Sequence, residues 1–100
     1  MIVKFITVHV KPGRRDAYLA AQEIWNTQTA RAPGYLGCHC GVAADEPDIV
    51  RVWIAWRSRA DLDRFMAEDH DRVAALAKAD DHYERIEVRI LDEVLSDLSF

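Results

Sequence analysis

The chain has 100 residues, of which 13 are Lys or Arg and 17 are Asp or Glu, so its net charge is −4. Half of the residues are apolar and 30% are charged, which is typical of a globular domain and excludes a disordered or fibrous chain. The negative charge argues against a nucleic-acid partner, because binding to phosphates requires a basic surface. We therefore expect a single domain over residues 1–100, with a core small enough to gain from a partner chain.

No apolar run approaches the roughly 18 residues that a membrane-spanning helix needs, so we expect no membrane partner. The apolar run Met1-Ile2-Val3 is followed directly by Lys4, and no small-residue cleavage site follows, which is unlike a signal peptide. Cys38 and Cys40 are badly placed to bridge each other and fit a reducing compartment. These features predict a cytoplasmic protein.

The first third of the chain predicts a strand followed by a helix. Residues 2–10 are rich in β-branched side chains and stop before Pro12-Gly13, which predicts a strand. A helical period then runs from Arg14 to about Thr29, and Ala32-Pro33-Gly34 ends it. The stripe expected to face the core is Ala17, Ala21, Ile24 and Trp25. The residues expected to point elsewhere are Arg15, Gln22 and Glu23.

Two further strands are predicted over Tyr35–Val42 and Ile49–Trp56, because residues 44–48 between them have the composition of a hairpin turn. Ser58 begins the next helix. Asp61 follows three residues later and completes an S-x-x-D capping pattern.

Asp69 falls in the middle of the apolar stripe of this second helix, where an unbroken helix would bury its charge. We therefore expect a break around Glu68 to His70, with Asp69 capping a second short helix. The last strand is predicted over Arg85–Asp92. A weak apolar pattern in the tail comes from Val94, Leu95 and Leu98.

The order strand, helix, strand, strand, helix, strand is that of the ferredoxin-like split unit, an α+β fold. It predicts one antiparallel four-stranded sheet with both helices on one face. Strand 1 should lie between strands 4 and 3, and strand 2 should lie at the far edge beside strand 3.

Alternation along the strands separates two faces of the sheet. The apolar set expected to face the helices is Leu36, Cys38, Cys40, Val42, Ile86, Val88 and Ile90. The set expected on the uncovered face is Tyr35, His39, Arg51, Trp53, Arg85, Glu87 and Arg89, together with Phe5. On strand 1, alternation separates Val3, Phe5, Thr7 and His9 from Ile2, Lys4, Ile6, Val8 and Val10, and the facing of that strand stays open. Aromatic side chains at this density predict a partner surface, and the simplest partner is a second copy related by a two-fold axis. Because polar groups accompany the aromatics, we expect a semi-polar cavity there.

The element order, Pro12-Gly13, the Ala32-Pro33-Gly34-Tyr35 turn and Trp56 at the end of strand 3 resemble the dimeric α+β barrel superfamily, which includes the antibiotic-biosynthesis-monooxygenase-like domains. Within it, Phe65-Met66 followed by His70-Asp71 resembles an uncharacterised family with a Phe-Met-x-x-x-His-Asp motif. The resemblance covers nearly the whole chain. It implies a homodimer whose sheets close into a barrel, with a pocket between sheet and helices in each subunit.

Members of this superfamily include oxygenases without a cofactor, haem-degrading enzymes, isomerases and proteins without a known activity. The haem-degrading members use an Asn, a Trp and a His. Here Phe65 stands in place of their Trp, Ala75 stands in place of their His, and strand 1 has no Asn. The resemblance therefore argues against haem degradation.

His70 and Arg51 are the catalytic candidates. Histidine titrates near neutral pH, so His70 can act as a base or donor toward a pocket, with Asp71 orienting it. The alternative is a half-buried histidine that bonds a backbone group near the helix break. Arg51 and Arg89 can hold a carboxylate or phenolate, and the alternative is that they pair with Glu87 or with the partner subunit.

The other substrate-binding candidates are Trp53, His39, His9 and Phe65. A metal site made from His9, His39 and His70 is disfavoured, because Arg51 would place a fixed cation beside the metal. We expect no metal and no cofactor, since no nucleotide, flavin or zinc-peptidase motif is present. The cysteines lack the C-x-x-C spacing and are expected in the core.

These observations predict a small-molecule-binding dimeric barrel that acts as a cofactor-independent monooxygenase on an aromatic or quinol-type compound. The protein would supply a base, an apolar environment and a cation for the developing oxyanion. Two alternatives stay open: a non-catalytic ligand-binding or assembly protein, and a small lactone or enol isomerase. Fold alone does not choose among them.

Overall fold

The computed structural model describes residues 1–97, and Leu98 of the predicted tail pattern lies outside them. The elements in chain order are β1 (Ile2–Val10), α1 (Arg15–Thr29), β2 (Tyr35–Ala43), β3 (Glu46–Trp56), α2 (Arg59–Glu68), α3 (His70–Ala77), the 3-10 turn η1 (Asp80–His82) and β4 (Tyr83–Leu91). Within residues 1–97, no helix is both long and apolar enough to cross a membrane.

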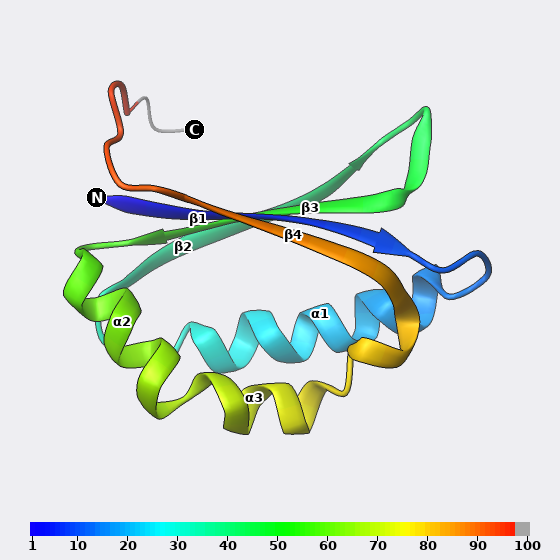
Figure 1. Cartoon of the computed structure of the whole chain (residues 1–100), viewed down its shortest axis with the longest axis horizontal. Helices are drawn as coiled ribbons and strands as arrows, with labels where there is room; N and C mark the ends of the chain where they lie inside the picture. The colour runs from blue at the N-terminus through cyan, green and yellow to red at the C-terminus, as the bar shows by residue number, and fades with distance from the viewer. Residues whose placement is uncertain (98–100) are drawn as a thin grey trace.

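The four strands form one antiparallel sheet in the order β2-β3-β1-β4, which confirms the predicted ferredoxin-like topology. All three helices lie on the same side of this sheet (Figure 1). The core lies between them, and its fully buried side chains include Val8 of β1 and Val50, Val52 and Trp56 of β3. The two central strands therefore carry most of the contact with the helices.

The register of β1 determines the facing of this strand, which the sequence pattern left open. Phe5 lies opposite Trp53 on β3 and opposite Arg89 on β4, so these three side chains share the face that the helices do not cover. We call this the open face; its residues are Val3, Phe5, Thr7, His9, His39, Arg51, Trp53, Arg85, Glu87 and Arg89. Lys4 and Ile6 point to the helix side with the buried Val8.

Strand β2 departs from the predicted alternation, because its pairing with β3 shifts between Tyr35 and Gly37. The irregularity turns Tyr35 toward the helix side, where its ring packs edge-on against Trp56. Leu36, predicted to face the helices, is instead 55% exposed. The open face thus lacks the tyrosine expected there. Cys40 is exposed and was wrongly placed in the core.

The buried face of α1 is rotated from the predicted stripe. Tyr18, Ala21, Gln22 and Thr29 are buried, whereas Ala17 and Ile24 are exposed. The prediction followed apolar residues and therefore assigned Gln22 to another face. In the structure this helix turns a partly polar surface toward the sheet.

The predicted break in the second helix is confirmed, since α2 ends at Glu68 and α3 begins at His70. Ser58 is the N-cap of α2, and its side chain accepts a hydrogen bond from the backbone N–H of Asp61, as predicted. The predicted side-chain cap by Asp69 is wrong, because its carboxylate bonds Arg72 instead, at 3.3 Å. The break changes the direction of the chain. As a result α2 lies against one end of the sheet and α3 runs beside α1 (Figure 1).

Candidate functional site

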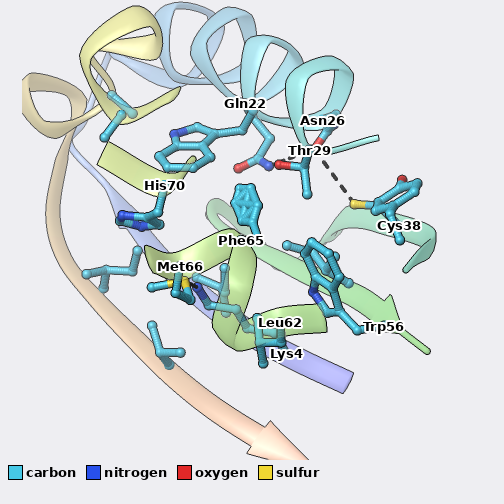
Figure 2. A pocket seen from close by; sticks show the side chains of 18 of the residues that line it. Lys4, Gln22, Asn26, Thr29, Cys38, Trp56, Leu62, Phe65, Met66 and His70 are labelled. Atoms are coloured by element: carbon cyan, nitrogen blue, oxygen red, sulfur yellow. Dashed lines mark hydrogen bonds between the residues drawn. The ribbon is translucent and has the colours of Figure 1, made fainter. Parts of the chain in front are cut away.

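A pocket of about 300 Å³ lies between the helices and the sheet. Its floor is the helix side of the sheet, its wall is α1, and α2 and α3 form its cover (Figure 2). The side chains used below are those of Lys4, Tyr18, Gln22, Trp25, Asn26, Tyr35, Cys38, Trp56, Phe65, Met66, His70, Ile86 and Val88. The sequence-based expectation of a pocket between sheet and helices is thus met in a single chain.

The mouth of the pocket lies along β4. Ile86 and Val88 point to the helix side of the sheet, yet 44% and 47% of their surface is exposed because no helix packs over them. Met66 at the facing edge of α2 is 40% exposed. The apolar rim made by these three side chains is a surface that water solvates poorly and that an apolar ligand can cover.

The α1 wall carries a chain of hydrogen bonds. The Tyr18 hydroxyl donates to Gln22 Oε1 at 2.6 Å, and Gln22 Nε2 donates to Asn26 Oδ1 at 2.9 Å. Cys38 Sγ donates to the same Asn26 oxygen at 3.7 Å, as Figure 2 shows. Burial raises the pKa of Tyr18 far above its usual value, so the phenol keeps its proton and remains the donor.

This chain of bonds determines what the wall offers to a ligand. The oxygens of Gln22 and Asn26 already accept hydrogen bonds, whereas each side-chain amide has two N–H groups to donate. The remaining N–H groups can therefore donate to an oxygen of a bound molecule. The wall favours ligands with carbonyl, hydroxyl or oxyanion groups.

His70 stands at the mouth side of the pocket, at the first residue of α3. Its ring lies 5.1 Å from that of Trp25 and 6.4 Å from that of Phe65, measured between centroids. Its Nδ1 is 3.2 Å from Oδ1 of the exposed Asp71. That contact leaves Nε2 as the ring nitrogen that can exchange a proton with a molecule in the pocket.

Lys4 is half-buried in the sheet floor, and burial lowers its pKa. Its Nζ donates to Met66 Sδ at 3.4 Å, and no carboxylate within residues 1–97 pairs with it. A thioether is a weak acceptor for an ammonium group. The pocket therefore contains a cation whose neighbours do not neutralise it.

Trp56 closes the α2 end of the pocket and is only 1% exposed. Its ring packs against Phe65 at a centroid distance of 5.2 Å. Its indole nitrogen is buried without a hydrogen-bond partner in the part of the chain that the structure describes. Leaving such a donor unpaired costs about 1–3 kcal/mol.

Of the predicted site residues, His70 and Phe65 line the pocket. The others lie on the open face, on the opposite side of the sheet: Arg51, Trp53, Arg89, His39 and His9. Within one chain the structure therefore does not bring the catalytic candidates His70 and Arg51 together. The tryptophans also differ from the expectation. Trp53 was expected near a ligand, but Trp25 and Trp56 are the tryptophans that line the pocket.

Several charged groups of the open face form ion pairs, with one another or with a neighbouring residue. Arg51 bonds Glu46 at 3.1 Å, which differs from the predicted partner Glu87. Glu87 instead lies 3.1 Å from both His9 and Arg85. Among residues 1–97 no group of three or more His, Cys, Asp or Glu side chains is arranged to hold a metal ion.

Sequence reasoning missed the polar wall on α1 and the half-buried cation of Lys4. Tyr18, Gln22 and Asn26 recur at intervals of four residues, which places them on one helix face together with Ala21 and Trp25. This spacing would have indicated that the polar residues face a pocket rather than the outer surface of the helix. Lys4 carried a similar signal, because it interrupts the inward-facing series of β-branched residues on β1.

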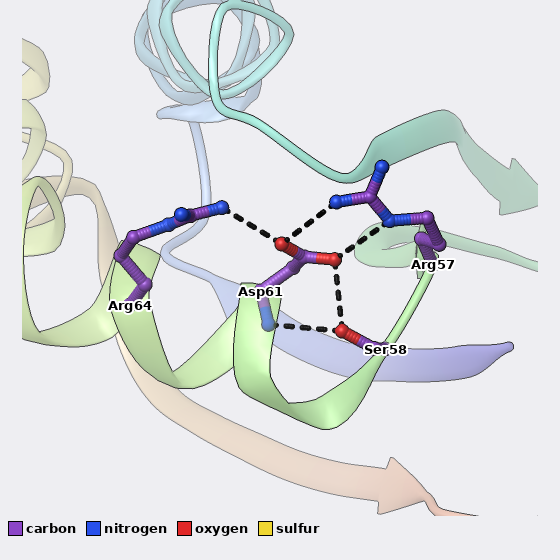
Figure 3. Close-up of polar contacts among 4 residues, drawn as sticks. All are labelled: Arg57, Ser58, Asp61 and Arg64. Carbon is purple, nitrogen blue, oxygen red and sulfur yellow. Dashed lines mark hydrogen bonds and ion pairs between the residues drawn. The ribbon is translucent and has the colours of Figure 1, made fainter.

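The α2 end of the pocket is held in place by Asp61, which is buried (Figure 3). Its carboxylate accepts hydrogen bonds from Ser58 at 2.8 Å, from Arg57 at 3.0 and 3.2 Å, and from Arg64 at 2.7 Å. Gly34 approaches so closely that a Cβ there would collide with the Asp61 side chain, and its φ of +85° also favours glycine. This cluster fixes the start of α2 against the turn before β2.

Comparison with known proteins identifies the fold and does not establish an activity. Residues 2–91 match the family described as "Domain of unknown function (DUF4937)". No curated protein is significantly similar in sequence. Among solved structures, a putative antibiotic biosynthesis monooxygenase from Nitrosomonas europaea is 23% identical, with a TM-score of 0.79 over 96% of this chain and 100% of that one. These similarities confirm the expected monooxygenase-like fold.

Two further structures agree with that result. Rv0793 from Mycobacterium tuberculosis is 21% identical, with a TM-score of 0.81 over 98% of each chain. SnoaB from Streptomyces nogalater, described as a cofactor-independent oxygenase and solved as a mutant, is 15% identical, with a TM-score of 0.80 over 97% of this chain and 96% of that one. At these identities the likeness concerns the fold, and the Phe-Met-x-x-x-His-Asp motif stays a prediction.

The Asp61 cluster makes stability depend on pH. The hydrogen bond from Ser58 and those from Arg57 hold the pKa of Asp61 below its usual value. The stabilisation is therefore present above the usual carboxyl pKa of about 4 and is lost as the pH falls through the lower folded value. We expect Asp61→Asn to lower the free energy of unfolding at pH 7, by an amount that shrinks below pH 4, in urea titrations at several pH values.

Asp63→Asn is the matched control, because Asp63 is exposed and pairs with Arg59 on the same helix. An exposed pair of this kind contributes about 0–1 kcal/mol, so this variant should unfold nearly as the wild type does at every pH. A loss for Asp61→Asn that stays constant down to pH 2 would contradict the role given to its ionised form.

The two cysteines should differ in reactivity. Burial raises the pKa of both thiols, and it raises that of Cys38 to about 11. The Cys38 thiol is also half-buried and bonded to Asn26, whereas Cys40 is exposed. Because the thiolate is the reactive form, the lone Cys38 of a Cys40→Ser variant should react with a chromogenic disulfide at pH 8 about tenfold more slowly than the lone Cys40 of Cys38→Ser. Equal rates would contradict the placement of Cys38 in the pocket wall.

Proposed function

Because this chain belongs to the DUF4937 family and has an antibiotic-biosynthesis-monooxygenase-like fold, we propose that its pocket between sheet and helices binds a small aromatic molecule. The volume of about 300 Å³ is at the lower end of the range of about 300–1,000 Å³ typical of ligand sites. Apolar and aromatic side chains line most of it, with a few polar groups on α1. That composition suits a molecule of two fused rings with an oxygen substituent.

We further propose that the protein acts on such a molecule as a cofactor-independent monooxygenase. The observation that supports this activity is His70, whose ring lines the pocket beside the rings of Trp25 and Phe65 while its Nδ1 lies 3.2 Å from the Asp71 carboxylate. A base in apolar surroundings can deprotonate a phenol, and the resulting phenolate is electron-rich enough to react with O₂ directly. A cofactor-independent oxygenase from Streptomyces nogalater shares this fold, which supports the same chemistry.

The reaction balances without an external reductant. For 1-naphthol, His70 would take the hydroxyl proton, and the phenolate would pass electrons to O₂. One oxygen atom forms a bond to the ring carbon opposite the hydroxyl, and that carbon loses its proton. The second oxygen atom leaves as water with both protons, and 1-naphthol is oxidised by four electrons to 1,4-naphthoquinone.

We expect the protein to consume O₂ with 1-naphthol as substrate and to form 1,4-naphthoquinone in equal amount, which an oxygen electrode and ultraviolet absorbance would measure. His70→Gln should lower this rate about 100-fold or more, because it removes the proton acceptor and keeps a polar side chain of similar size. His82→Gln is the matched control, since His82 lies outside the pocket, and it should leave the rate unchanged.

A thermal shift measurement with 1-naphthol tests ligand binding separately from oxygenase activity. Stabilisation by 1-naphthol without oxygen uptake would contradict the oxygenase and favour a non-catalytic binding protein. Oxygen uptake that is unchanged in His70→Gln would contradict the role of His70 as base.

We also propose a homodimer formed through the open face. Trp53 is 40% exposed there and packs against Phe5 at a centroid distance of 5.0 Å. Arg89 and His39 are exposed on the same face. A second copy would cover the aromatic pair and bring the charged residues of two sheets together. The substrate-binding roles predicted for Trp53, Arg89, His39 and His9, and the catalytic role predicted for Arg51, would require this second copy.

Trp53→Glu should convert the dimer into a monomer, because it places a charge at the centre of the proposed interface. Light scattering coupled to size-exclusion chromatography measures the mass directly. Leu76→Glu is the control, since Leu76 is 52% exposed on α3, on the helix side of the molecule. A wild-type protein that elutes as a monomer at high concentration would contradict the proposed dimer.

A further inference from the structure

The α2 end of the pocket contains two polar groups that the proposed oxygenase chemistry does not use. One is the ammonium of Lys4, which has no carboxylate partner within residues 1–97 and donates to a methionine sulfur. The other is the indole N–H of Trp56, which is buried and unpartnered within the same residues. Both groups are donors, and the two residues that carry them line the same cavity.

The sheet register brings these two residues close together. Lys4 lies opposite Ile54, and Ile2 lies opposite Trp56, so Lys4 and Trp56 are diagonal neighbours on adjacent strands and the same face. Diagonal neighbours of this kind lie about 7 Å apart at the backbone, within reach of two long side chains. In Figure 2 the nitrogen-bearing edge of Trp56 faces the side on which Leu62 and Lys4 are drawn.

The charge distribution along the pocket favours an anion at this end. The acidic residue of the pocket lining is Asp80, which bonds the Tyr83 hydroxyl at 3.2 Å. Tyr83 pairs with Val10 on β1, six residues along the strand from Lys4. At about 3.3 Å per residue, the two ends are roughly 20 Å apart. A negative group beside Lys4 would therefore meet a cation and be far from the carboxylate.

We infer that Lys4 and Trp56 form an anion-binding subsite, which selects aromatic ligands that carry a carboxylate. The ammonium supplies the charge, and the indole N–H supplies a directed hydrogen bond to one carboxylate oxygen. The aromatic ring of the ligand would then extend between Phe65 and the sheet floor toward the mouth at β4. This inference rests on the proposal that the pocket is the ligand site, and it adds the chemical class of the ligand.

The unusual position of Lys4 supports a role in binding rather than in folding. Its inward-facing neighbours on β1 are Ile2, Ile6 and Val8, so an apolar residue would suit the position better. Burial of an ammonium without an anionic partner opposes folding. A carboxylate from a ligand would supply the missing charge.

The test compares 2-naphthoate with 2-naphthamide, a neutral molecule of nearly the same shape, by calorimetric titration. The wild-type protein should bind 2-naphthoate at least about tenfold more tightly. Lys4→Met should abolish this preference and still bind 2-naphthamide, because Met has a similar size and no charge. Its melting temperature should equal or exceed that of the wild type, which would show that the variant is folded.

Lys78→Met is the matched control, because it removes the same charge from an exposed residue at the end of α3. It should keep the preference for 2-naphthoate. An equal loss of preference in Lys78→Met and Lys4→Met would show a general surface attraction and overturn the subsite. Equal binding of both probes by the wild type would overturn the subsite and leave the pocket proposal intact, whereas binding of neither would overturn both.

Trp56→Phe tests the second donor and should lower the preference several-fold while the binding of 2-naphthamide changes little. Because Trp56 is a core residue, a measurement on the wild type complements this variant. The indole N–H proton of Trp56 should move downfield in the NMR spectrum with 2-naphthoate, more than with 2-naphthamide. An unchanged resonance with bound 2-naphthoate would remove Trp56 from the subsite.

Discussion

The width of the sheet relative to its helices is the constraint on which the rest of the structure depends. The helices pack on β1 and β3, where Val8, Val50 and Val52 are almost completely buried. Strand β4 lies beyond this layer, and its inward-facing Ile86 and Val88 remain about half exposed. The space between β4 and the helices therefore stays open, and it becomes a pocket because α2 and α3 bend over it at Asp69.

The contents of that space differ from those of an ordinary core. A small domain of this size usually fills its interior with apolar side chains, because unpaired polar groups oppose folding. Here one wall is a hydrogen-bonded series from Tyr18 to Asn26, and the floor contains the cation of Lys4. The Asp61 cluster shows that the same chain pairs its buried charges elsewhere. The unpaired groups of the pocket are therefore concentrated where a ligand can satisfy them.

The sequence predicted the element order, the sheet topology and the helix break well, because each depends on local signals such as turns, caps and periodicity. It predicted the site less well. A shift in strand pairing after Tyr35 places that side chain on the helix side of the sheet, and no local sequence pattern predicts such a shift. The prediction of the buried face of α1 was wrong because it considered only the apolar residues of the helix. His70 was placed in the pocket correctly, whereas Arg51 and Trp53 were grouped with it although the sheet separates them.

The central claim is that small aromatic molecules bind between the helices and the sheet and not on the open face. Nuclear Overhauser effects between bound 2-naphthalenemethanol and the three indole rings measure this directly, because Trp25 and Trp56 line the pocket whereas Trp53 lies on the open face. The account predicts contacts from the probe to Trp25 and Trp56. Contacts to Trp53 alone would contradict it.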